Sequence, residues 1–69
     1  MGPLVQALRI ENLEARIGLQ QFVCAELELE IELARSAKER RTLSARRTQA
    51  IREQNLAKFA LELLKREAE

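Results

Sequence analysis

The chain has 69 residues and a formal net charge of +1, with 46% hydrophobic and 33% charged residues but only 3% aromatic ones. One cysteine, two glycines and no histidine exclude an intramolecular disulfide, a zinc site, imidazole-based catalysis and a glycine-rich phosphate loop. Alanine, leucine, glutamate and arginine are the commonest residues, and these strong helix formers predict an all-α fold in a single domain, residues 1–69. We expect no cofactor, no metal and no enzymatic activity.

The N-terminal region shows no basic segment followed by an apolar run, so it does not resemble a signal peptide. The longest uncharged stretch, residues 17–25, is too short to cross a bilayer. A lone cysteine is typical of a reducing compartment. We therefore predict the cytoplasm of a cell, or of an infected host cell, and no membrane partner.

The first predicted helix covers about residues 4–34 and carries a heptad seam at positions a and d. Gln20 interrupts this seam, and we interpret it as tolerated, because its long side chain reaches solvent, rather than as setting the register. The seam is the predicted oligomer interface, made by Ile10, Leu13, Ile17, Cys24, Leu27 and Ile31. Cys24 is interpreted as a small buried apolar residue, the alternative being a cross-dimer disulfide.

A second apolar stripe follows the opposite face of the same helix. It is made by Leu8, Ala15, Phe22 and Leu29, with Leu19 and Leu33 beside them. A helix that is apolar on two opposing faces needs at least two neighbours to cover it.

Residues 26–33 alternate between glutamate and apolar side chains, which is the pattern of a strand. Glutamate is unfavourable in strands, and the heptad pattern continues on both sides. The alternation therefore divides the leucines between the two apolar stripes of one helix.

The break between helices is predicted at about residues 35–36. Ser36 and Glu39 have the spacing of a capping box, in which each side chain satisfies a free backbone amide of the other residue. No glycine or proline marks a turn there, so one continuous helix remains the alternative.

The second predicted helix covers about residues 37–67 and also has two stripes. One contains Leu43, Ala50, Ala57, Leu61 and Leu64, and the other contains Leu56, Phe59, Ala60 and Leu63. We expect the stretch of residues 56–64 to pack on Leu8, Leu19 and Phe22 of the first helix. The alternative is that this stretch docks on a membrane or in the groove of a partner.

A chain this short, without a disulfide or a metal, usually needs a partner to complete its core. The predicted architecture is therefore a helical hairpin that forms a homodimer, with four helices in one bundle. The alternative is one continuous long helix in a coiled-coil dimer.

The two halves of the chain differ in charge. Residues 1–34 hold two arginines and six glutamates, whereas residues 35–69 hold ten basic and five acidic residues. The candidate nucleic-acid-binding residues are Lys38, Arg40, Arg41, Arg46, Arg47 and Arg52. Either these side chains contact the phosphate backbone of duplex RNA or DNA, or they neutralise the glutamates of residues 26–32.

The leading functional hypothesis is a small adaptor or regulatory protein that binds itself and a protein partner by helix packing. The alternative is a dimeric protein that binds a nucleic-acid duplex through an arginine-rich helix face.

Overall fold

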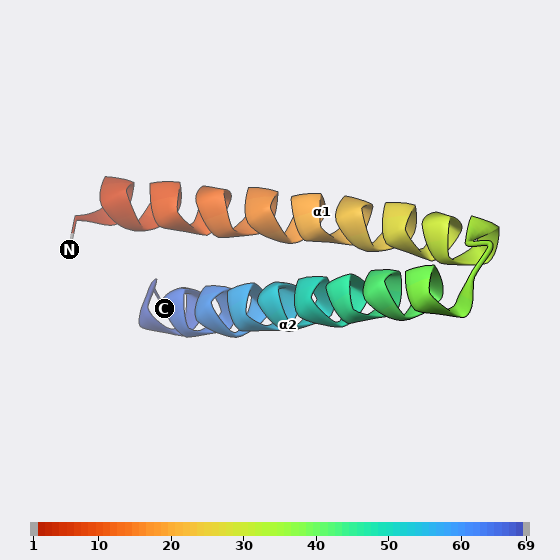
Figure 1. The fold of residues 1–69 in the computed structure, drawn as a ribbon. Helices are drawn as coiled ribbons and strands as arrows, with labels where there is room; N and C mark the ends of the chain where they lie inside the picture. The colour runs from red at the N-terminus through yellow and green to blue at the C-terminus, as the bar shows by residue number, and fades with distance from the viewer. Residues whose placement is uncertain (1, 69) are drawn as a thin grey trace.

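The computed structural model describes residues 2–68, which form two antiparallel helices lying side by side (Figure 1). Helix α1 is Pro3–Leu33 and helix α2 is Ala37–Ala68, and residues 34–36 connect them. The Cα extents are 51 × 14 × 13 Å, which is the shape of two long rods in contact. The predicted all-α hairpin is confirmed, and the alternative of one continuous helix is wrong.

The N-terminus of α1 begins where proline is best tolerated. Pro3 stands in the first turn, where a backbone N–H has no intrahelical acceptor, so its missing donor costs nothing. The helix then runs through the alternating residues 26–33 without a break, so their interpretation as helix is also confirmed.

The helices separate at Ala34 because its backbone is extended, with φ −63° and ψ 133°. The Ser36 hydroxyl then caps α2 by accepting a hydrogen bond from the Glu39 amide at 3.1 Å. The Glu39 carboxylate reaches back to the amide of Arg35 at 3.4 Å, one residue before the one expected. A serine cap and an extended residue therefore make the turn without glycine.

The core follows the line of contact between α1 and α2. Its most buried members form one cluster near the bend, which contains Leu27, Ala34, Leu43 and Ala50. Val23, Cys24 and Ile31 pack against this cluster and are partly buried. Towards the open end of the hairpin, which is the end opposite the bend, the buried residue is Ala57.

Alanine at the contact line allows the two backbones to approach closely. Ala50 and Ala57 are only 5% exposed and lie one heptad apart on α2, between Leu43 and Leu64. Small residues facing large ones interdigitate without a void, so this spacing suits the leucines and isoleucines of α1. The stripe of residues 43, 50, 57, 61 and 64 is thus the one that faces α1.

Candidate functional site

The six residues predicted as an oligomer interface lie on the face of α1 that is turned towards α2. Leu27 is buried, and the remaining five are half-buried: Ile10, Leu13, Ile17, Cys24 and Ile31. The a/d seam therefore serves the hairpin itself. Its contact with a second chain stays a prediction. Cys24 is a half-buried free thiol packed against the core cluster.

The second stripe of α1 is exposed along its whole length. We call this face the outer α1 surface, made by Val5, Leu8, Ala15, Leu19, Phe22, Leu29 and Leu33. Phe22 is 61% exposed and Leu33 is 75% exposed, although each carries a large apolar side chain. Helix α2 covers only one of the two apolar faces of α1. A single hairpin therefore lacks the second neighbouring helix that we expect to cover the other face.

The prediction that residues 56–64 pack on Leu8, Leu19 and Phe22 is wrong in the hairpin. Leu56, Phe59 and Leu63 are exposed, and so are their expected partners on α1. The physical reason is that Leu61 and Leu64 of the other α2 stripe already occupy the contact with α1, and a helix cannot turn both stripes to the same neighbour. We call Leu56, Phe59 and Leu63 the α2 apolar patch.

Two open, shallow grooves follow one side of the helix contact. The groove nearer the open end has a volume of about 520 Å³ and a largely apolar lining that includes Leu13, Leu19, Leu56 and Ala60. The groove nearer the bend has a volume of about 480 Å³ and a more polar lining that includes Glu26, Glu30 and Arg46. Neither groove encloses a small molecule, so they suit an elongated partner better than a substrate.

Gln20 and Glu53 separate the two grooves. The Gln20 Nε2 donates to the Glu53 Oε2 at 2.9 Å, across the two helices. This solvent-exposed hydrogen bond gives Gln20 a polar partner on α2 at its half-buried seam position. Sequence reasoning missed Glu53, because nothing in the spacing of the two residues predicts which α2 residue faces Gln20.

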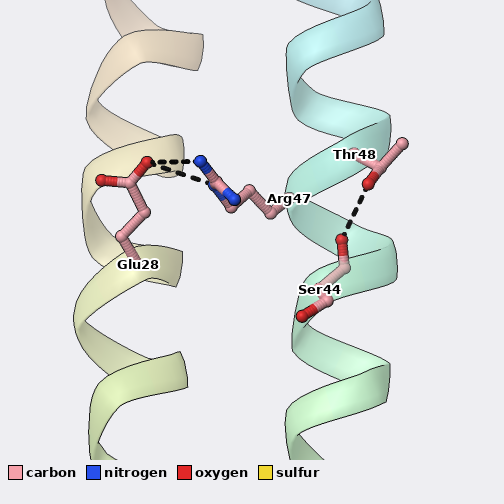
Figure 2. A network of polar contacts seen from close by, with 4 residues as sticks. All are labelled: Glu28, Ser44, Arg47 and Thr48. Atoms are coloured by element: carbon pink, nitrogen blue, oxygen red, sulfur yellow. Dashed lines mark hydrogen bonds and ion pairs between the residues drawn. The ribbon is translucent and has the colours of Figure 1, made fainter.

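Of the six candidate nucleic-acid-binding residues, Arg47 is the one that pairs with a carboxylate within residues 2–68. Its Nε and Nη2 both approach the Glu28 Oε1, at 3.1 and 3.0 Å (Figure 2). The two side chains are 44% and 55% exposed, so the pair contributes about 0–1 kcal/mol. The hairpin brings the acidic and basic segments together as expected, with one direct contact.

The other cations lie on different faces of α2. Arg40 donates to the Ala34 carbonyl at 3.4 Å, and Arg46 lines the groove near the bend. Lys38, Arg41 and Arg52 are exposed, and helical spacing places them on the face opposite Leu43 and Ala50. The structure therefore divides the predicted cluster into an inner group and an outer group.

Neither helix holds a stretch that is apolar enough over a bilayer-spanning length, judged on residues 2–68. The same residues contain no cluster of acidic or cysteine side chains suited to a metal ion. In comparisons with known proteins, the chain matches no family model, no curated protein and no solved structure.

Proposed function

We propose that this protein is a helical interaction module that associates with a second copy of itself and acts by helix packing rather than by catalysis. The observation that carries the proposal is the amount of apolar surface that one hairpin leaves uncovered. The outer α1 surface and the α2 apolar patch both remain exposed.

The exposed area supports this proposal quantitatively. The chain has an accessible surface of 5551 Å². A compact monomer of the same mass exposes about 4,400 Å². The difference, about 1,100 Å² per chain, exceeds the roughly 800 Å² that each partner buries in a standard stable interface. A dimer that covers this difference would expose about as much surface per chain as a compact monomer of the same mass.

A sedimentation measurement on the purified chain tests the proposal. We expect a mass of twice 7.9 kDa that falls towards the single-chain mass on dilution. A single-chain mass at every concentration would contradict self-association. Far-ultraviolet circular dichroism on the same samples provides the control, because a helical monomer and an unfolded chain have different spectra.

A duplex nucleic acid is the second candidate partner, and a specific observation favours it. Lys38, Arg41 and Arg52 share the outer face of α2, and no carboxylate of residues 2–68 forms an ion pair with them. Exposed cations on one helix face can contact successive phosphates. Residues 41–52 contain no aromatic side chain, so this face offers no base stacking.

Fluorescence anisotropy with random-sequence RNA and DNA duplexes tests this second function. Three phosphate contacts predict a slope of about −3 in the plot of log affinity against log salt. Replacing Arg41 and Arg52 by alanine should weaken binding to all sequences equally, whereas the matched Arg66→Ala variant, in the last turn of α2, should bind as the wild type does. The absence of binding at low salt would exclude this function.

A further inference from the structure

The outer α1 surface has two pairs of positions that are symmetric about its midpoint, Leu19. One pair is polar, Asn12 and Glu26, which lie seven residues before and seven residues after Leu19. Val5 and Leu33 are likewise equidistant from Leu19. A two-fold dimer uses the same patch on both subunits, so it requires a surface that is complementary to itself. Antiparallel copies that meet at this midpoint bring the positions of these two pairs together.

Gly18 lies at this midpoint, and the hairpin gives no reason for it. Glycine is among the least favourable residues inside a helix. The backbone of Gly18 is ordinary, since no glycine of residues 2–68 has a positive φ. A Cβ added at Gly18 would meet nothing within 4 Å, so α2 does not require the missing side chain either. A glycine on an exposed face is explained if another backbone approaches closely at that point.

The charge distribution favours the antiparallel arrangement. The C-terminal half of α1 carries four glutamates within residues 26–32, and its N-terminal half carries both arginines of the helix, Arg9 and Arg16. A parallel copy would place the acidic segments beside each other. An antiparallel copy places each acidic segment beside the N-terminal half of α1, where Arg9 and Arg16 are balanced by Glu11 and Glu14, so the repulsion between the copies is smaller.

We infer that two copies of this chain pair through their outer α1 surfaces, with the α1 helices antiparallel and the two-fold axis close to Gly18 and Leu19; this inference rests on the proposed self-association. Phe22 of one copy then packs near Ala15 and Gly18 of the partner subunit. Asn12, about 10 Å from the axis along the helix, lies level with the partner's Glu26, whose carboxylate accepts from its amide.

Two phenylalanines of equal exposure provide a matched test. Phe22 on α1 is 61% exposed and Phe59 on α2 is 60% exposed. We expect Phe22→Asp to sediment as a monomer and Phe59→Asp to remain a dimer, with equal helical content. Loss of the dimer in Phe59→Asp alone, or equal loss in both variants, would overturn the inference and leave self-association standing. A monomeric wild type would overturn both this inference and the proposed self-association.

Gly18→Leu provides a second variant that does not threaten folding, because leucine favours helix and the position is open in the hairpin. We expect the dimer dissociation constant to rise roughly ten- to hundred-fold, as for an overpacked contact. An unchanged constant would show that no backbone approaches Gly18. The matched Ala45→Leu variant, on the exposed face of α2, should leave the constant unchanged.

Cysteine cross-linking tests the direction of pairing, in a Cys24→Ala background. A residue on the two-fold axis meets its own copy, so Leu19→Cys should form a disulfide-linked dimer on mild oxidation. Leu33 lies fourteen residues from Leu19, so antiparallel copies of it are about 40 Å apart and Leu33→Cys should not cross-link. Cross-linking of both variants would indicate parallel helices, and cross-linking of neither would place the axis elsewhere; either result overturns the inference.

Discussion

Enlarging Ala50 to leucine tests whether the alanines set the distance between α1 and α2. Ala50 is 5% exposed and belongs to the core cluster with Leu27, Ala34 and Leu43. The three added carbons have no space unless the helices separate. Overpacking of this kind costs about 1–3 kcal/mol in the free energy of unfolding. For a domain of this size the melting temperature should fall by about 4–8 °C per kcal/mol.

The matched control is Ala45→Leu on the exposed side of the same helix. Alanine and leucine differ little in helix propensity, so the control should stay within about 0.5 kcal/mol of the wild type. Urea unfolding followed by circular dichroism measures both variants. All samples must have the same protein concentration, because self-association makes the apparent stability depend on it.

The result that would refute this reasoning is an Ala50→Leu variant as stable as the wild type. It would mean that the helices separate without cost, and that the alanines of α2 do not determine how α1 packs. An equal loss in Ala45→Leu would also refute it, because the cost would then come from leucine on α2 in general.

Three further perturbations have expected outcomes that urea unfolding can measure. Leu27→Ala should cost about 2–4 kcal/mol, because Leu27 is buried in the core cluster; a loss below 1 kcal/mol would argue against that core. Ser36→Ala should cost about 1 kcal/mol through the lost cap of α2, and Ser36→Asp should restore it; equal stability of the two variants would speak against capping. A double-mutant cycle on Glu28 and Arg47 should give a coupling below about 1 kcal/mol that disappears in high salt; a salt-independent coupling would contradict the exposed geometry.

The heptad spacing of the sequence predicts which side chains meet within the hairpin. The a and d residues from Ile10 to Ala34 are all half-buried or buried, and Gln20 is among them. The serine half of the capping box is also predictable from spacing. Both features depend on local geometry, in which a fixed number of residues per turn decides which side chains share a face.

The spacing does not predict in the same way which neighbour covers the second apolar stripe of α1. Apolar spacing shows that Leu8, Phe22 and Leu29 need cover, but it does not distinguish a helix of the same chain from one of another chain. The sequence-based choice of residues 56–64 was wrong because the two stripes of α2 are similar in strength. The choice between them depends on the tight fit of Ala50 and Ala57, which spacing alone does not reveal.

The position of the core cluster beside the bend has a consequence for the order in which the hairpin folds. The Glu28–Arg47 contact closes a loop of 19 residues, whereas the Gln6–Leu64 contact at the open end spans 58. Loop-closure entropy favours the shorter loop by about 1 kcal/mol. Zipping should therefore begin at the bend and proceed towards the open end. Amide hydrogen exchange should be slowest around Leu43 and Ala50 and become progressively faster along both helices with distance from the turn.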